Sequence, residues 1–155
     1  ERIHHRSDVT VRVIDAYGEG AGLARSLLQR GVQVDEVPFT GLGQACLNSD
    51  VVIIEAAAAG PSALVAPSGS YAAAVCGIQS GSQVWAVVGH GRALPRPFFE
   101  VIEQQLAAKN TMEADDEVVP IGVITHVVGP TGVSSTEDTL REDCVVAAEL
   151  LRLGL

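Results

Sequence analysis

The chain has few aromatic residues and few basic ones. Only 4% of its 155 residues are aromatic, so a core must be built mainly from Val, Ala, Leu and Ile. Ten Lys and Arg residues stand against 19 Asp and Glu residues, which gives a formal net charge of -9. Binding to a phosphate backbone needs clustered Lys and Arg that release counterions. Direct binding to nucleic acid is therefore not expected.

Long apolar runs and clustered cysteines are also absent from the sequence. No segment approaches the roughly 18 apolar residues of a membrane span, and no basic-then-apolar signal segment opens the chain, so no membrane partner is expected. Cys46, Cys76 and Cys144 lie in apolar contexts without a C-x-x-C pair or a His at ligand spacing. Such cysteines are typical of reduced structural thiols. We expect a cytoplasmic protein with no metal site and no cofactor.

The length is typical of one domain. The sequence begins at Glu1 rather than Met. We expect residues 1–8 to be an N-terminal arm, the remnant of an absent upstream segment, and residues 9–155 to form a single α/β domain.

Hydrophobic patterns predict strands that alternate with helices. The unbroken apolar run 51–55 is typical of a strand buried on both faces. The Ala/Gly/Pro-rich stretch after it and the polar stretch 109–117 are expected to be loops. This rhythm predicts right-handed crossovers and a doubly wound, mostly parallel α/β sheet. The strands are expected near 9–15, 32–38, 51–55, 84–88 and 122–128, and the helices near 23–30, 42–47, 70–79, 98–108 and 136–153.

Candidate ligand-binding residues follow the predicted strands, where open α/β sheets bind ligands. Backbone amides at helix starts attract anions, and Ser68 or Ser70 is alternatively a simple N-cap. Glu55 is the candidate general acid if burial desolvates it; alternatively it caps a helix or pairs with Arg92. His90, flanked by glycines, is either part of the site or a surface residue. The predicted ligand-binding set is Gly18, Gly20, Ser68, Gly69, Ser70, His90 and Arg92, which with Glu55 should line one concavity.

Gly18, Gly20 and Gly22 follow a strand and open a helix, as in a dinucleotide-binding fingerprint. Leu23, however, lies where the fingerprint needs Gly or Ala for close approach of the helix. A plain strand-to-helix turn is the alternative.

Several segments together resemble the C-terminal domain of the initiation factor 2B alpha/beta/delta family. They read VRVIDAYGEGAG, DVVIIEAAA, PSGSYAAAVCG, VWAVVG and VPIGVITHVVGPTGV, and the resemblance spans roughly residues 9–133. The family includes regulatory subunits of a guanine-nucleotide exchange factor, methylthioribose-1-phosphate isomerase and ribose-1,5-bisphosphate isomerase. The resemblance implies a Rossmann-like, three-layer α/β/α fold with a mostly parallel sheet, similar to ribose-5-phosphate isomerase and CoA transferases. It also implies assembly as a homo-oligomer or with related subunits.

Several positions depart from the active members of that family. Their Arg-Pro and Glu-Gly-Arg become Tyr17-Gly18-Glu19-Gly20-Ala21, which keeps Glu-Gly and loses both arginines. The general-acid Asp after Gly-Ala aligns with Glu55-Ala56-Ala57, and the Asn-Lys pair with Ala66-Pro67. Without these residues, the chain lacks the groups for phosphate binding and for proton transfer that the resemblance would otherwise imply.

Three functions stay open. The first is a non-catalytic, initiation-factor-2B-like domain that binds a small phosphorylated metabolite and acts through subunit association. The second is a sugar-phosphate (aldose-ketose) isomerase with a displaced site around Glu55, His90 and Arg92. The third is a dinucleotide-binding module. Retention of the scaffold without the arginines and the acid favours the first.

Overall fold

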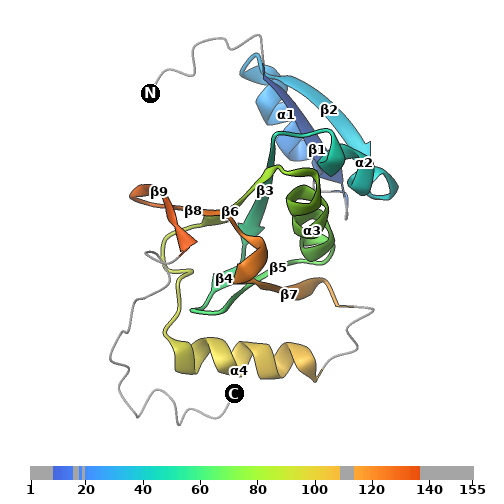
Figure 1. Cartoon of the computed structure of the whole chain (residues 1–155). Helices are drawn as coiled ribbons and strands as arrows, with labels where there is room; N and C mark the ends of the chain where they lie inside the picture. The colour runs from blue at the N-terminus through green and yellow to red at the C-terminus, as the bar shows by residue number, and fades with distance from the viewer. Residues whose placement is uncertain (1–8, 16–17, 19, 109–113, 137–155) are drawn as a thin grey trace. The chain divides into compact units, whose positions relative to one another are not determined.

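A computed structural model describes residues 9–15, 18, 20–108 and 114–136 (Figure 1). The chain divides into two compact units, residues 1–48 and 49–155, and each is described by itself. Both units are mixed α/β structures. The single domain over residues 9–155 stays a prediction.

The first unit is a strand–helix–strand element followed by two short helices. β1 (Thr10–Asp15) pairs in parallel with β2 (Gln33–Pro38), and α1 (Gly20–Gln29) connects them. The short helices are η1 (Phe39–Gly41) and α2 (Leu42–Leu47). Val13 of β1 and Ala24 of α1 are buried. The predicted parallel pair and both predicted helices are confirmed in this unit.

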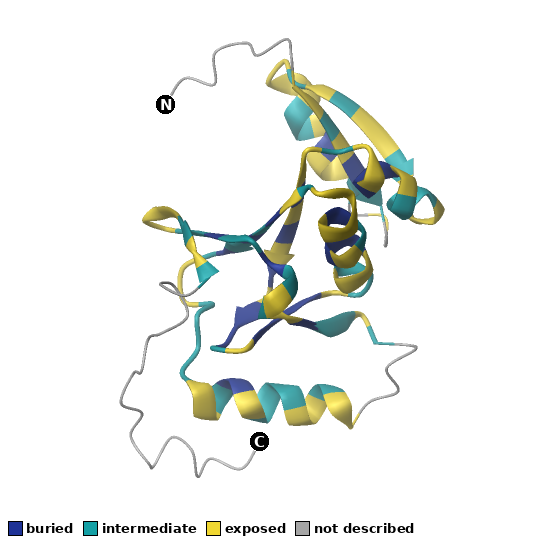
Figure 2. Ribbon diagram, viewed as in Figure 1, coloured by how far each residue is buried: buried dark blue, intermediate teal, exposed yellow. Residues whose placement is uncertain are grey.

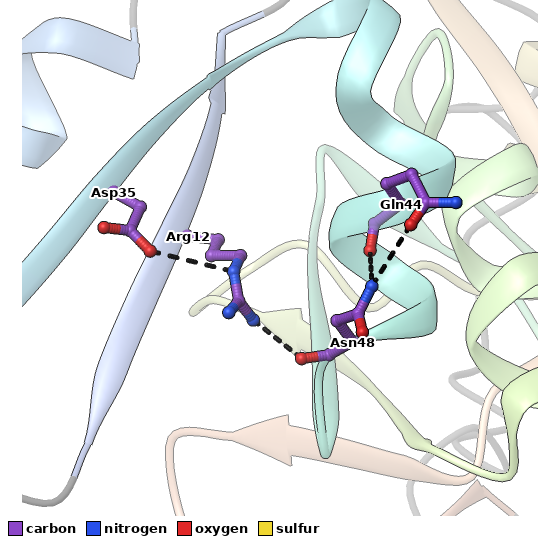
Figure 3. A network of polar contacts seen from close by, with 4 residues as sticks. All are labelled: Arg12, Asp35, Gln44 and Asn48. Carbon is purple, nitrogen blue, oxygen red and sulfur yellow. Dashed lines mark hydrogen bonds and ion pairs between the residues drawn. The ribbon is translucent and has the colours of Figure 1, made fainter.

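A polar network in the first unit joins both strands to the end of α2 (Figure 3). The Arg12 guanidinium on β1 donates to the carbonyl oxygen of Asn48 at 2.7 Å and lies 3.8 Å from the Asp35 carboxylate on β2. The Asn48 side chain in turn donates to the carbonyl oxygen of Gln44 at 2.8 Å. A cation is favourable at this helix end because its last carbonyl groups carry partial negative charge. Arg12 therefore fixes α2 to β1.

The second unit contains a four-stranded, mostly parallel sheet. β3 (Val51–Ala56), β6 (Gln83–Val88) and β8 (His126–Gly129) are parallel, and β9 (Gly132–Ser135) runs antiparallel to β8. The order is β3-β6-β8-β9. α3 (Ser70–Ser80) packs on β3 and β6. The predicted strands 51–55 and 84–88 and the predicted helix 70–79 are confirmed.

The prediction that β3 is buried on both faces is wrong. Val52, Ile54 and Ala56 are buried, whereas the alternate residues are exposed (Figure 2). Ile53 is 67% exposed. Successive side chains of a strand point to opposite faces, and α3 packs against the face that carries Val52. An apolar run alone does not distinguish one covered face from two.

A second sheet in this unit occupies the Ala/Gly/Pro-rich stretch that was predicted to be a loop and begins its third strand at the end of the predicted loop 109–117. β4 (Ala58–Ala59), β5 (Ala63–Pro67) and β7 (Asp116–Pro120) pair antiparallel, and every residue from Ala63 to Ala66 is buried. The local strand signal of these stretches is weak, because only two adjacent apolar residues in β5 and in β7 are accompanied by Ala, Pro, Asp and Glu, which strands disfavour. Here pairing and burial override that preference.

The remaining elements complete the second unit. α4 (Arg96–Ala107) contacts β7 and buries Phe99. The strand predicted at 122–128 is shorter, because η2 (Ile121–Val123) follows β7 and the strand β8 begins only at His126. Beyond Thr136, the helix predicted at 136–153 lies outside the described residues. Among the helices that the structure describes, none is both long and apolar enough to cross a membrane.

Gly77 lets α3 approach the sheet closely. A Cβ atom there would lie 2.9 Å from Cγ2 of Val52 and 3.1 Å from Cγ2 of Val84. Gly77→Val is expected to lower the free energy of unfolding by about 2–3 kcal/mol, since overpacking a dense core forces side chains and backbone to shift. Urea denaturation measures this loss. Ala72→Val, at an exposed position of the same helix, is the control and should change stability by less than about 1 kcal/mol. Equal losses in the two variants would contradict close packing at Gly77.

Candidate functional site

Glu55 and Arg92 form an ion pair at the end of β3. The Arg92 Nη1 atom donates to Oε1 of Glu55 at 2.8 Å and to the carbonyl oxygen of Ala56 at 2.7 Å. The loop that carries Arg92 is fixed by β4: the Ala59 N–H donates to the Arg92 carbonyl oxygen, and the Leu94 N–H donates to that of Ala59, both at 2.8 Å. Of the alternatives predicted for Glu55, the structure therefore contains the ion pair with Arg92.

The side chain of Glu55 is open to water in the structure. Its side chain is 70% exposed and the Arg92 side chain 40% exposed. The sequence made Glu55 a candidate general acid on the condition that it is buried, and this side chain is not buried. Next to a guanidinium group, Glu55 instead serves as the acceptor of a charge-assisted hydrogen bond.

The start of α3 is held by β7 and by the two residues that precede it. The Ser68 hydroxyl donates to the Ala114 carbonyl oxygen at 2.5 Å, and the Ser68 N–H donates to that of Asp115 at 2.8 Å. The Tyr71 N–H donates to Oε1 of Glu117 at 2.8 Å. The N-cap residue is Gly69, with φ of 97° and no side-chain cap, so the prediction of Ser68 or Ser70 as N-cap is wrong. The cap comes instead from β7.

The glycine turn before α1 closes on an aspartate. Oδ1 of Asp15 accepts hydrogen bonds from the N–H groups of Gly18 at 2.6 Å and Gly20 at 3.3 Å. Gly18 has φ of 85°, which an L side chain rarely adopts. These bonds join Gly18 and the start of α1 to the end of β1.

His90 lies in the turn after β6 and is exposed. Gly91, the next residue, has φ of 73°, and the Arg92 N–H closes the turn on the Gly89 carbonyl oxygen at 3.2 Å. Within the described residues, no group of three or more His, Cys, Asp or Glu side chains could hold a metal ion.

The predicted site residues thus fall into separate local groups. Glu55 and Arg92 are in contact. Ser68, Gly69 and Ser70 belong to the same unit, and Ser68 is hydrogen-bonded to the two residues just before β7. Gly18 and Gly20 belong to the other unit. That all eight residues line one concavity stays a prediction.

Sequence reasoning missed two carboxylates, Asp15 and Glu117. Asp15 ends a strand three residues before Gly18, a spacing at which Asp commonly caps a turn. Glu117 gave no local signal, because it lies 46 residues from its partner Tyr71.

Arg92→Ala is expected to lower the free energy of unfolding by only about 1 kcal/mol, since exposed ion pairs contribute little. Glu55→Gln should cost less, because the glutamine oxygen still accepts from Arg92. Urea denaturation of both variants checks this. A loss of several kcal/mol would show that the hydrogen bond from Arg92 to the Ala56 carbonyl group fixes the end of β3.

Comparison with known proteins gives matches among solved structures. No family model and no curated protein matches this chain. The tetrameric eIF2B-beta2-delta2 complex of Chaetomium thermophilum has a chain with a TM-score of 0.67 and 19% identity, covering 84% of this chain and 43% of its own. The translation initiation factor eIF-2B of Pyrococcus horikoshii has a TM-score of 0.64, 14% identity and coverage of 81% and 49%.

An enzyme shares the same fold. The 5-methylthioribose 1-phosphate isomerase of Pyrococcus horikoshii has a TM-score of 0.62 and 14% identity, covering 81% of this chain and 42% of its own. The chain therefore spans less than half the length of these structures. The resemblance predicted from the sequence is confirmed at the level of the fold, which this chain shares with eIF2B subunits and with a sugar-phosphate isomerase.

Proposed function

We propose that this chain is a non-catalytic, initiation-factor-2B-like domain that acts in the cytoplasm through association with copies of itself or with related subunits. We include in the proposal a weak site for a small phosphorylated metabolite. The observation that carries the non-catalytic assignment is the environment of Glu55. This acid is largely exposed and paired with Arg92 at 2.8 Å.

The positions aligned with the isomerases' Asn-Lys pair support this assignment. Ala66 is fully buried in β5 and Pro67 ends that strand. Neither side chain can hold a phosphate or move a proton. With the family's arginines also absent, a bound sugar phosphate would lack the groups that fix it and the acid that protonates it.

The finer fold belongs to the same proposal. We infer a Rossmann-like, three-layer α/β/α arrangement with a mostly parallel sheet. Its support is the parallel pairing of β1 with β2, of β3 with β6 and of β6 with β8, together with the helical connections between the paired strands.

Association is supported by the tetrameric complex in which one similar structure was solved. Soluble assemblies most often have twofold symmetry, so the chain is expected to form a dimer of about twice its 16.1 kDa mass. Light scattering across a hundredfold range of protein concentration, about 1–100 μM, measures this. A monomer mass throughout, without pairing to an added eIF2B beta or delta subunit, would contradict the proposal.

No isomerase activity is expected with methylthioribose-1-phosphate or ribose-1,5-bisphosphate. The Pyrococcus isomerase, assayed alongside, is the positive control. Turnover at enzymatic rates that Glu55→Gln abolishes would instead establish an isomerase with a displaced site. Thermal stabilisation by NAD, but not by sugar phosphates, would establish a dinucleotide-binding module, since a ligand stabilises the state that it binds.

A further inference from the structure

One face of the four-stranded sheet in the second unit is mostly apolar and open to water. Paired residues of neighbouring strands lie on the same face of a sheet, so the register places two rows of side chains on the face opposite α3. The rows are Ile53–Trp85–His126–Ser135 and Glu55–Val87–Val128–Val133. Ile53 is 67% exposed and Val133 is 54% exposed. A contiguous open apolar patch of this kind marks a contact surface.

The other face of the same sheet is covered by a helix. α3 packs there, where its Gly77 approaches Val52 of β3 and Val84 of β6. Parallel strands normally carry helices on both faces, because their crossover connections place helices there. In the described part of this unit, α3 thus covers one face of a sheet type that normally has two covered faces.

The chain continues from the edge of the open face. β9 is the edge strand of the order β3-β6-β8-β9 and ends at Ser135. Thr136, the next residue, is helical and is the last residue that the structure describes. Residues 137–155 follow it in the sequence. This segment therefore starts beside the open face, one residue after the strand.

The sequence of this segment predicts an amphipathic helix. Its start reads Ser135-Thr136-Glu137-Asp138, with acids where the helix end is positive. Apolar residues then recur at i, i+4, i+8 and i+11, the spacing of one helix face. These residues are Leu140, Cys144, Ala148 and Leu151.

The predicted helix is long enough to cover the sheet. A helix over residues 136–153 would be about 27 Å long at 1.5 Å per residue. The outer strands of a four-stranded sheet lie only about 14 Å apart. One helix can therefore cross from β9 to β3.

We propose that segment 137–155 packs as a helix on the open face, with its apolar stripe against Ile53 and Trp85. This inference rests on the three-layer arrangement in the proposed function and names the segment that forms its second helical layer. While the segment covers this face, the face is closed to partner subunits. Subunit association is therefore expected to use other surfaces of the chain.

Trp85 reports on the cover directly. It is the only tryptophan of the chain, and its indole lies on the open face beside His126, with ring centroids 5.6 Å apart. Leu151→Asp places a charge in the apolar stripe and should release the helix, so acrylamide should quench Trp85 fluorescence more strongly than in the unmodified chain. Val146→Asp is the matched control, because it places the same residue on the opposite side of the predicted helix. It should leave the quenching unchanged.

The Cys144 thiol reports from the other side of the contact. Labelling of the full chain with iodoacetamide, followed by mass spectrometry, separates Cys144 from Cys46 and Cys76. Cys144 should react about tenfold more slowly in the unmodified chain than in Leu151→Asp, because reaction of a covered thiol requires local opening.

Ile53→Asp changes the sheet side of the contact and should also speed the labelling of Cys144. Ile78→Asp is its control, since Ile78 is an exposed isoleucine on α3, the helix that covers the other face. Circular dichroism establishes that each variant is folded. If Ile53→Asp does not fold, Leu151→Asp still tests the proposal, because it leaves every residue of the sheet unchanged.

Two results would overturn the inference. One is equal quenching of Trp85 and equal labelling of Cys144 in the unmodified chain and in Leu151→Asp. The other is protection of Trp85 that is lost on dilution together with a fall in mass by light scattering. That result would show that a second copy covers the face, so the inference would fail while subunit association stands. A monomer mass at every concentration, with protection that Leu151→Asp removes, would support the inference although association had failed.

Discussion

Replacing Phe99 by alanine is expected to lower the free energy of unfolding by about 3–5 kcal/mol, the range for removing a buried aromatic side chain. Phe99 is 1% exposed and lies on the face of α4 that packs against the antiparallel sheet. It forms a cluster with the buried residues Ala58, Ala63 and Val65. Because its neighbours are small, they cannot expand to fill the cavity that alanine would leave. Urea denaturation of the full chain measures the loss.

Phe98→Ala is the control for this prediction. Phe98 is the adjacent residue of the same helix and is only partly buried. Its removal deletes the same atoms and has the same effect on helix propensity, so it should cost clearly less than Phe99→Ala. Similar losses in the two variants would contradict the assignment of Phe99 as the residue that joins α4 to this sheet.

Strands with strong apolar patterns were predictable from the sequence. β1, β2, β3 and β6 begin and end within one or two residues of the expected positions, because Val and Ile runs bounded by polar or glycine residues indicate strands. The helix over 70–79 was equally clear from its boundaries. Local signals were sufficient for these elements because propensity and burial agree.

The antiparallel sheet was not predictable from local signals. β5 is rich in alanine and β7 begins with Asp116 and Glu117, residues that strands disfavour on average. Only the pairing of segments some fifty residues apart makes them strands, as in the pair Leu64–Val119. A single sequence holds no record of such pairing.

In the candidate site, too, local features were predictable and features that depend on distant pairing were not. The Glu55–Arg92 pair was anticipated as an alternative, and it forms because Glu55 lies near the end of β3 while Arg92 follows β6, its parallel neighbour. Amides at helix starts were also correctly recognised as positions for a negative charge. The source of that charge was not recognised at either helix. For α3 it depends on β7, the strand that the sequence did not reveal.

Gly60→Ala is expected to destabilise the second unit by about 2–3 kcal/mol or more, since overpacking costs typically 1–3 kcal/mol and the overlap here is severe. A Cβ atom on Gly60 would overlap the Phe99 ring. Gly60 is itself buried, and its N–H donates to the Ala63 carbonyl oxygen at 2.9 Å in the connection between β4 and β5. The backbone therefore cannot move away from α4 without disturbing the strand pair.

A double-mutant cycle with Phe99→Leu tests the cause of this loss. Leucine is smaller than phenylalanine, so it should make room for the methyl group that Gly60→Ala adds. The destabilisation by Gly60→Ala should then be at least about 1 kcal/mol smaller in the Phe99→Leu background, an interaction energy typical of residues in contact. Gly43→Ala is the control substitution, because nothing lies within 4 Å of a Cβ atom at that position. If the effects of Gly60→Ala and Phe99→Leu simply add, the loss comes from the backbone of the β4–β5 connection, and the close approach of Phe99 to Gly60 does not control the packing of α4.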